Sequence, residues 1–541
     1  MLTFISDRIK MNGGIRMGMM DEKLLKLPIG IQSFDKLRQG NYLYVDKTKR
    51  LQELVTSIPW CFLSRPRRFG KSLTLSTLDA MFSGKGDLFK GLAAEKWVEE
   101  QAGRPSPVLR LDMAHYLTGD KKSFENSLYI NLKVFGQRHG FSMPRGDVEG
   151  AAGALKDVIE GLYDDKGPVV VLIDEYDKPI LDNISDLNAA NEMRQTLRSF
   201  YTVLKSFDEY LRFVMLTGIS KFSKTGVFSA LNNLEDISMD FQYGDIMGYT
   251  QTELEDNLSN WIEDAAARMR LSRNELLSRM KDYYDGFCFD GKMKLYNPFS
   301  VMQCLKKGDI ANYWYVSGSS SFIVTYMKQH GIQDPAEYRH MEVSKDFADT
   351  HEIETSTPES FLYQSGYLTI EEKRESSLIL DYPNDEVRIS LVRMYLDEVY
   401  HVKNYIALGT KLWGALSEGN IKETVRLYNI ALSGIPYTDF ANHGELFYRS
   451  LFLMLLRGAS ITANGEVPTN LGRSDVLIQF LKRVVVLEFK FSKDGAGIDG
   501  LRQKGKDQIE EKGYAKPYDV GDRAITTAVI VIDGEKRKAV L

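Results

Sequence analysis

The residues with the clearest chemical potential form a phosphate-binding pattern. An apolar run, Trp60–Ser64, ends in a turn, and Gly70-Lys71-Ser72 then opens a predicted helix over 72–82. Backbone N–H groups around Gly70 and at the helix N-terminus favour an anion. Lys71 would reach the β- and γ-phosphates of a nucleotide, and the Ser72 hydroxyl would bind Mg²⁺. Arg65 stands where the usual pattern has a glycine, so a basic turn that caps an ordinary helix is the alternative interpretation.

A second pattern supports nucleotide binding. The run 168–173 is apolar and rich in β-branched residues, which is typical of a central parallel strand, and it ends in Asp174 and Glu175. Because ligands bind at the carboxyl ends of parallel strands, Asp174 would hold Mg²⁺ and Glu175 would polarise an attacking water. A strand that ends in a solvated acidic turn is the alternative. The two patterns together predict ATP or GTP binding.

The elements that would position these residues alternate between strand and helix. A further buried run, 211–216, carries Thr217 and Ser220 at its end, where either hydroxyl could sense the γ-phosphate or cap the junction between strand and loop. This alternation predicts an α/β fold with a doubly wound parallel sheet. From Thr250 to about Arg279 the pattern is helical, which predicts a packed lid. Residues 334–390, including Phe361–Leu368, indicate short strands and turns.

A second group of chemically capable residues lies near the C-terminus. The runs 472–478 and 484–490 predict two adjacent strands joined by a short turn around Leu481–Arg483. Side chains alternate between the faces of a strand, so Glu488 and Lys490 share one face. Asp475 begins the partner strand, and the three side chains can converge. An acid in so apolar a strand needs a partner or a metal.

Two acids and a lysine at this spacing suit metal-assisted phosphodiester cleavage. The carboxylates of Asp475 and Glu488 would hold Mg²⁺ or Mn²⁺, and Lys490 could orient the water or neutralise developing charge. Glu445 in a helix upstream and Gln508 in a helix downstream could add a ligand or a phosphate contact. Alternating charges on a surface strand are the alternative interpretation.

Composition limits the remaining choices. At 541 residues, a typical size of about 150 residues per domain predicts three or four domains. The net charge is −5, so a contact with nucleic acid requires a local basic patch. Three scattered cysteines, without a C-x-x-C pair, fit a reducing cytoplasm. We expect no signal peptide and no membrane span.

The motifs, taken in order, resemble one family: bacterial and archaeal proteins with an N-terminal AAA-ATPase-like domain and a C-terminal domain of the PD-(D/E)XK nuclease superfamily. The resemblance extends from about Leu27 to about Lys536, and in this family Arg65 is a normal part of the loop. The motifs that carry it are 44–48, 64–72, 174–177, 217–220, 284–287, 296–300, 364–369, 382–388 and the hairpin 472–490.

The resemblance implies a role for each matching residue. The nucleotide site would comprise Arg67, Arg68, Phe69, Gly70, Lys71, Ser72, Leu73 and Thr217, with Ser72 and Asp174 on the Mg²⁺ side and Glu175 as the water-activating acid. The nuclease core would comprise Asp475, Glu488 and Lys490, with Glu445 and Gln508 in the flanking helices. Relatives often have a Tyr-His pair after the helix glutamate, whereas here Arg449 follows Tyr448. Arg67 and Arg68 could instead act across a subunit interface or form surface pairs.

The expected division of the chain follows these motifs. It comprises an N-terminal extension (1–26), the ATPase domain (27–249), the helical lid (250–330), a connecting region (331–400) and the nuclease-like domain (401–541).

Three functions compete. The first is an ATPase coupled to a metal-dependent nuclease that acts on nucleic acid, DNA in preference to RNA, in genome defence or mobile-element biology. The second is a regulatory ATPase or nucleotide switch whose C-terminal domain is an inactive binding module for DNA or a protein. The third is a scaffold with a protein partner and no nucleic acid. The expected cofactors are ATP and Mg²⁺, with Mn²⁺ as an alternative at the nuclease-like site, and a homo-oligomer is compatible with an AAA-like domain.

Overall fold

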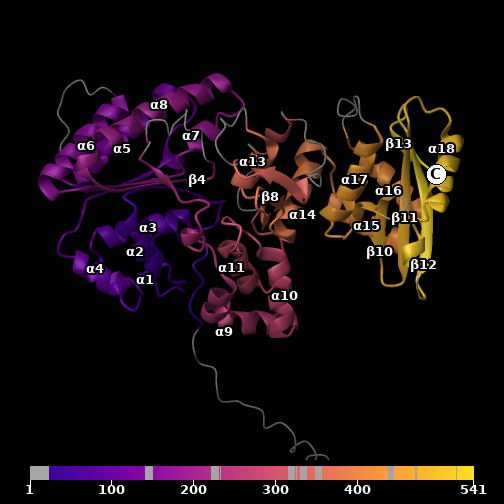
Figure 1. Cartoon of the computed structure of the whole chain (residues 1–541), viewed down its shortest axis with the longest axis horizontal. Helices are drawn as coiled ribbons and strands as arrows, with labels where there is room; N and C mark the ends of the chain where they lie inside the picture. Colours follow the sequence, from indigo (N-terminus) through magenta and orange to yellow (C-terminus); the bar gives the residue numbers. More distant parts are fainter. Residues whose placement is uncertain are drawn as a thin grey trace, which may run out of the picture.

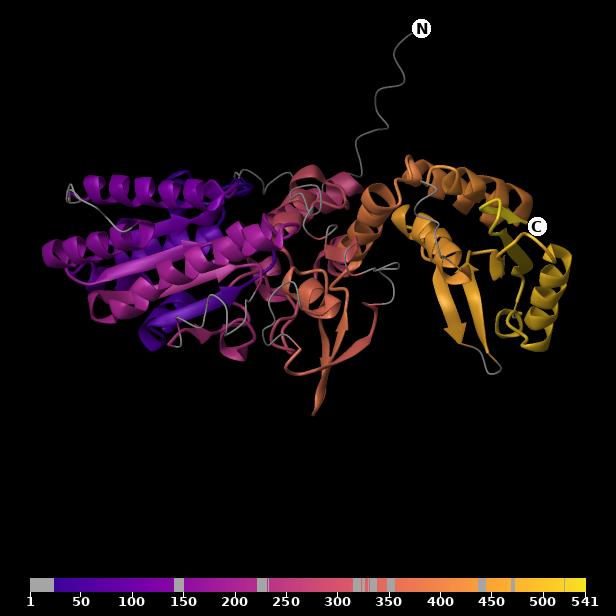
Figure 2. The ribbon, with the colours of Figure 1, turned by 90° about the horizontal axis from the view of Figure 1, so that it is seen from above.

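The computed structural model places three parts, each with its own sheet, one after another along the long axis (Figures 1 and 2). The structure describes residues 24–140, 150–220, 231, 233–314, 323, 326–328, 330, 338–347, 356–435, 444–468, 472–519 and 521–541. The expected N-terminal extension, 1–26, lies almost entirely outside these residues.

The first sheet is parallel throughout, with the strand order β2-β3-β4-β1-β5. β4 therefore separates the strand that precedes the phosphate loop, β1, from the acid-bearing strand, β3. All carboxyl ends of the strands lie at the same edge of the sheet, which brings the loop after β1 towards Asp174. The strands are β1 (Trp60–Ser64), β2 (Val108–Asp112), β3 (Val169–Asp174), β4 (Leu211–Gly218) and β5 (Glu235–Asp236).

Helices cover both faces of this sheet, so the predicted doubly wound α/β fold is confirmed (Figure 1). Strands buried on both faces explain the continuous apolar runs in the sequence. On one face lie α1 (Phe34–Gln39), α2 (Thr48–Ser57), α3 (Lys71–Phe82) and α4 (Glu95–Gln101); on the other lie α5 (Lys121–Arg138), α6 (Gly150–Lys166), α7 (Lys178–Leu181) and α8 (Leu187–Ser206).

The helical pattern that follows forms a small bundle. α9 (Gln251–Met269), α10 (Arg273–Tyr284) and α11 (Pro298–Lys307) share a core with Leu27, Leu43 and Val45. Capping boxes at Thr250 and Ser272 start α9 and α10, because each hydroxyl and the glutamate three residues later satisfy free N–H groups. The bundle is thus tied to the segment that precedes the phosphate loop.

The part between the two larger sheets contains an antiparallel sheet with the order β6-β8-β7. Its elements are β6 (Met341–Ser344), α13 (Pro358–Gln364), β7 (Thr369–Lys373), β8 (Ser377–Asp381), α14 (Asp385–Met394) and a π-helical turn at 395–399. The expectation of strands and turns over 334–390 was wrong for 358–364 and for 385–390, which lie in α13 and α14. Thr357 caps α13 and Pro358 occupies its first turn, a recognised start signal.

The C-terminal sheet has the order β13-β12-β11-β10-β9, with only β11 and β12 parallel among its described pairs. The predicted hairpin corresponds to β10 and β11. The strands are β9 (Asn464–Pro468), β10 (Arg473–Gln479), β11 (Arg483–Ser492), β12 (Ala524–Asp533) and β13 (Lys538–Val540). The helices are α15 (Tyr405–Glu418), α16 (Ile421–Leu432), α17 (Glu445–Gly458) and α18 (Ile498–Glu511).

Among the described residues, no helix combines the length and the hydropathy that crossing a bilayer requires.

Candidate nucleotide site and candidate metal centre

The loop between β1 and α3 has the geometry of an anion cradle. Gly70 adopts φ +98° immediately before α3, a conformation that favours glycine. No side chain caps α3, so its first-turn N–H groups are available to a ligand. The Lys71 Nζ donates to the carbonyl oxygens of Arg65 (2.7 Å) and Pro66 (3.1 Å). Burial lowers the pKa of Lys71, while Asp174 and Glu175 oppose that shift.

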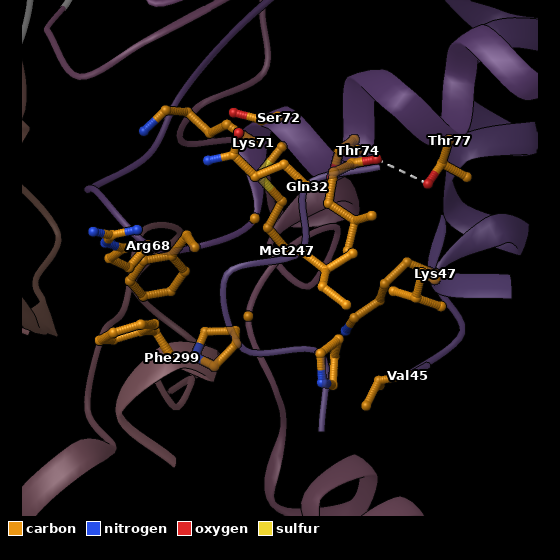
Figure 3. Close-up of a pocket in the computed structure, with 18 of the residues that line it drawn as sticks. Gln32, Val45, Lys47, Arg68, Lys71, Ser72, Thr74, Thr77, Met247 and Phe299 are labelled. Carbon is orange, nitrogen blue, oxygen red and sulfur yellow. Dashed lines mark hydrogen bonds between the residues drawn. The ribbon is translucent and has the colours of Figure 1, made fainter. Parts of the chain in front are cut away.

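A cavity of about 540 Å³ opens onto this loop, a size typical of small-ligand sites. Residues 67–74 form one wall, so seven of the predicted nucleotide-binding residues, Arg67–Leu73, line the same cavity. Gln32, Val45, Met247 and Phe299 line it as well (Figure 3), although none was predicted to do so from the sequence. The Arg68 guanidinium lies over the Phe299 ring, 4.9 Å from its centroid. The lid helix α11 therefore completes the cavity.

The two acids after β3 lie in different surroundings. Glu175 lines the cavity, has φ +48°, and has its pKa raised mainly by burial. Asp174 is buried behind it, accepting from the Glu175 N–H (3.1 Å) and from the Thr217 hydroxyl (2.7 Å). Thr217 does not line the cavity, so it orients Asp174. A buried acid, Asp174, is thus held in place beside a half-buried one, Glu175.

Asp177 contributes a further acid to this edge, although no role was predicted for it. Its Oδ2 accepts from the N–H groups of Ile219 and Ser220 and from the Ser220 hydroxyl, at 2.7–2.9 Å. The Ser220 hydroxyl thus fastens the loop after β4 to the loop after β3.

Arg65 is a structural residue of the loop. Its side chain is 1% exposed and donates to the carbonyl oxygens of Ser64 and Ser238, at 2.9 and 2.8 Å. Its guanidinium lies 4.2 Å from the centroid of Phe289. Burial lowers the Arg65 pKa to about 10. The residue in the usual glycine position is thus anchored in the interior and does not line the cavity.

The C-terminal acids meet across the β10–β11 hairpin. Val476 pairs with Leu487, so Asp475 and Glu488 lie one residue beyond that pair on neighbouring strands. Asp475 Oδ2 accepts from the Phe489 N–H (2.7 Å), and Glu488 Oε1 accepts from Lys490 Nζ (2.7 Å). The predicted convergence of Asp475, Glu488 and Lys490 is therefore present in the fold.

One oxygen of the Glu488 carboxylate, Oε2, is buried without a hydrogen-bond donor, although Lys490 pairs with the other. The Glu488 side chain is 1% exposed. Burial, together with the nearby charge of Asp475, raises the pKa of Glu488 to about 7. A buried carboxylate oxygen without a partner, beside a second carboxylate, fits a divalent cation, which prefers oxygen ligands.

The flanking residues lie at this site to different degrees. Glu445, the first residue of α17, has its pKa raised by burial and feels the charges of Lys490 and Asp475. Gln508 Nε2 donates to the Tyr514 hydroxyl at 3.1 Å, so its amide is already engaged. Arg449, on the same helix as Glu445, donates to Asp475 Oδ1 at 2.7 Å. No role for Arg449 was assigned from the sequence.

Glu445, Asp475 and Glu488 do not bring three ligand atoms within 4.8 Å of one another. Among the described residues, the one group of three whose ligand atoms all lie within 4.8 Å of one another is His340, Glu371 and Asp381 in the middle part. Asp381 there is paired with Arg339 at 3.2 Å. That group was not predicted from the sequence, and its ion pairs account for its geometry.

Comparisons with known proteins identify two regions. A family described as "Predicted AAA-ATPase" matches residues 28–228, and the PD-(D/E)XK nuclease superfamily matches residues 443–540. An uncharacterized protein from the vnfD 5′ region of Azotobacter chroococcum mcd 1 is 33% identical over 507 residues, covering 91% of this chain and 93% of that protein.

Solved structures with similarity to this chain include two archaeal proteins. ORC2 of Aeropyrum pernix, in ADPNP and ADP complexes, has a TM-score of 0.27 at 12% identity and covers 69% of this chain and 96% of its own. CDC6P of Pyrobaculum aerophilum has a TM-score of 0.27 at 11% identity and covers 63% and 89%. Scores this low support no argument about function.

Proposed function

Because this chain belongs to the family in which a predicted AAA-ATPase domain precedes a domain of the PD-(D/E)XK nuclease superfamily, we propose that it hydrolyses ATP and thereby controls a metal-dependent nuclease site. The proposed substrate is DNA in preference to RNA, in the cytoplasm, in genome defence or mobile-element biology. The proposed domains are those expected from the sequence: 27–249, the lid 250–330, the connecting region 331–400, and 401–541.

One observation carries the nuclease proposal: the buried Glu488 Oε2 without a partner, next to Asp475 on the neighbouring strand. A purely structural cluster would pair all of its buried oxygens, because an unpaired buried acceptor is costly. Asp475 and Glu488, with Glu445 nearby, would hold Mg²⁺ or Mn²⁺. A bound divalent cation supplies an activated water and stabilises the leaving oxygen. Lys490, hydrogen-bonded to Glu488, would orient the water.

At the nucleotide site, the chain's own groups have separate tasks. The first-turn N–H groups of α3 and the Lys71 ammonium would hold the phosphates, and Ser72 and Asp174 would hold Mg²⁺. Thr217 keeps Asp174 in position. Glu175, which faces the cavity with a raised pKa, would polarise the attacking water. Phe299 lies on α11 and lines the cavity, so a bound nucleotide would change the position of this helix.

The alternative of an inactive binding module is favoured by one contact. Arg449 occupies Asp475 Oδ1, so a cation of the chain already compensates one proposed metal ligand. A site that is permanently closed in this way would bind DNA or a protein without cutting.

The test is cleavage of plasmid and single-stranded DNA with Mg²⁺ or Mn²⁺, with and without ATP. We would compare wild type with Lys71→Ala and Glu488→Gln, and use Glu423→Gln, an exposed carboxylate on α16, as the matched control. The proposal expects cleavage in wild type and in the control, none in Glu488→Gln, and altered ATP dependence in Lys71→Ala. ATP hydrolysis without any DNA cleavage would contradict the nuclease proposal and favour an inactive binding module.

A further inference from the structure

A second, larger concavity lies along β2, an edge strand of the first sheet. It has a volume of about 1060 Å³ and shares no lining residue with the nucleotide cavity. Its walls come from α3, β2, the loop before β2, and the ends of α5 and α6. The basic residues that line it are Arg104, Arg110, Arg138, His139, Lys166 and Arg212, and Asp79 is the only acidic one among the described residues of its lining. We call it the β2 groove.

Among the residues that the structure describes, the arginines of the β2 groove have no acidic partner. Within the described part of the chain, no carboxylate forms an ion pair with Arg104, Arg110, Arg138 or Arg212, whereas many other arginines are paired. Like charges that converge without counterions repel one another. In a chain with a net charge of −5, such a concentration is local and requires an explanation.

Helix dipoles explain only part of this charge. Arg138 ends α5 and Lys166 ends α6, and cations at helix C-termini are favourable. Arg104, Arg110 and Arg212 lie instead on a loop and on two strands. Arg212 is held in place: it donates to Gln101 Oε1 (2.7 Å) and Ser106 Oγ (3.1 Å). A fixed guanidinium of this kind binds an anion with little loss of side-chain entropy.

We propose that the β2 groove binds the phosphate backbone of duplex DNA. Its described lining contains cations but only one aromatic residue outside histidine, Phe135, so it offers little for the base stacking on which single-strand binding depends. Charge without base-reading groups gives contacts that are independent of sequence. This inference rests on the proposed function for the identity of the polyanion. The ATPase domain would then have a DNA-binding site that is separate from the nuclease-like site.

The experiment measures binding apart from cleavage. Fluorescence anisotropy of a labelled duplex would be recorded over a series of salt concentrations, with the full chain carrying Glu488→Gln. The test variant is Arg104→Ala with Arg138→Ala. Arg110 is not used because it also donates to the Ser72 carbonyl in the first turn of α3. The control, Arg279→Ala with Lys422→Ala, removes two exposed cations on α10 and α16.

We expect the groove variant to bind duplex about tenfold more weakly at physiological salt. The slope of log K against log salt is negative, and its magnitude should decrease by roughly 2. The control variant should keep the parent affinity and slope. A single-stranded probe should bind more weakly than duplex, and inorganic phosphate should compete only at high concentration. Equal affinity of the groove and control variants, or no binding by the parent chain, would overturn the proposal.

Failure of the groove and failure of the nuclease are distinguishable. If duplex binding depends on Arg104 and Arg138 but wild type does not cleave DNA, the groove proposal is supported and the nuclease proposal is contradicted. Cleavage by wild type with unchanged binding in the groove variant would do the reverse. Melting temperatures identify a folding defect, and Arg104→Gln alone, on an exposed loop, provides a milder second variant whose unchanged affinity would also count against the groove.

Discussion

The Nη1 atom of Arg449 lies 2.7 Å from Oδ1 of Asp475, and the two side chains are only 12% and 11% exposed. The other oxygen of Asp475 accepts from the Phe489 N–H. Both oxygens of a proposed metal ligand are therefore engaged by the chain itself. A metal ion that binds Asp475 must therefore displace the Arg449 guanidinium from Oδ1 or share that oxygen with it.

Replacing Arg449 with alanine should destabilise the metal-free chain and make it more responsive to metal. Removing one partner of a buried ion pair leaves an uncompensated charge, which lowers the free energy of unfolding by about 3 kcal/mol. Mn²⁺ should restore more of that loss in Arg449→Ala than it adds to wild type, because Asp475 is then available. Thermal melting with and without Mn²⁺ measures both effects.

The control for this prediction is Arg426→Ala, which breaks a solvent-exposed ion pair with Glu423 and should leave the melting temperature nearly unchanged. If Mn²⁺ stabilised wild type and Arg449→Ala equally, Asp475 would not be a metal ligand.

Replacing Arg65 with glycine, the residue of the usual phosphate-loop pattern, should weaken the fold. The substitution leaves the Ser238 carbonyl without its donor and opens a space beside Phe289, which together lower the free energy of unfolding by about 3 kcal/mol. Because Arg65 does not line the nucleotide cavity, ATP affinity of the folded chain should change little. Urea denaturation and ATP titration measure the two quantities. A large loss of ATP affinity at unchanged stability would show that Arg65 belongs to the binding site.

The parts of the site that depend on local chain geometry were predictable. Strand, turn and helix follow one another within 60–82, so the phosphate loop could be read directly, and side-chain alternation placed Glu488 and Lys490 on one face of β11. The start of α13 was also predictable, because Thr357 is an ordinary N-cap residue and Pro358 favours the first turn of a helix. The prediction of strands and turns for the residues after them overlooks this signal.

Contacts between distant segments were not predictable from periodicity. Gln32, Val45, Met247 and Phe299 meet in one cavity only because the lid bundle packs on the N-terminal segment. Arg449 reaches Asp475 from a different element, and nothing in the local sequence of either residue encodes that pairing. Such contacts are set by tertiary packing, which a single sequence read in windows does not contain.

Glu386 should make the stability of the chain depend on pH near neutrality. It is fully buried and accepts from the N–H groups of Tyr313 and Trp314, and burial raises its pKa from 4.5 to about 7. Because the folded chain holds the proton more tightly than the unfolded chain, this stability is present below about pH 4.5 and is lost as the pH rises through about 7.

Glu386→Gln cannot titrate, so its urea midpoint should lack this loss. Wild type should lose stability relative to the variant between about pH 4.5 and about pH 7. The control is Glu418→Gln, an exposed residue at the end of α15, which should follow wild type. Parallel pH profiles for Glu386→Gln and wild type would contradict the assignment.

Gly366 should be required for the shape of the phosphate loop. It has φ +85°, and a Cβ placed on it would lie 2.4 Å from the Pro66 Cβ. Gly366→Ala therefore combines a disfavoured backbone with a clash against the loop, lowering the free energy of unfolding by about 3 kcal/mol. The Pro66 carbonyl also accepts from Lys71, so a displaced Pro66 should weaken ATP binding.

The matched control is Gly91→Ala, which has φ +78° but open space around its Cβ, and which should lose only about 1 kcal/mol. Urea denaturation and the anisotropy of a fluorescent ATP analogue would be measured for both variants. Equal effects of the two substitutions would show that Gly366 is needed only for its backbone conformation and not for its contact with Pro66. A selective loss of ATP affinity in Gly366→Ala would establish that the middle part of the chain supports the phosphate loop, because Gly366 follows α13 directly and Pro66 lies within the loop.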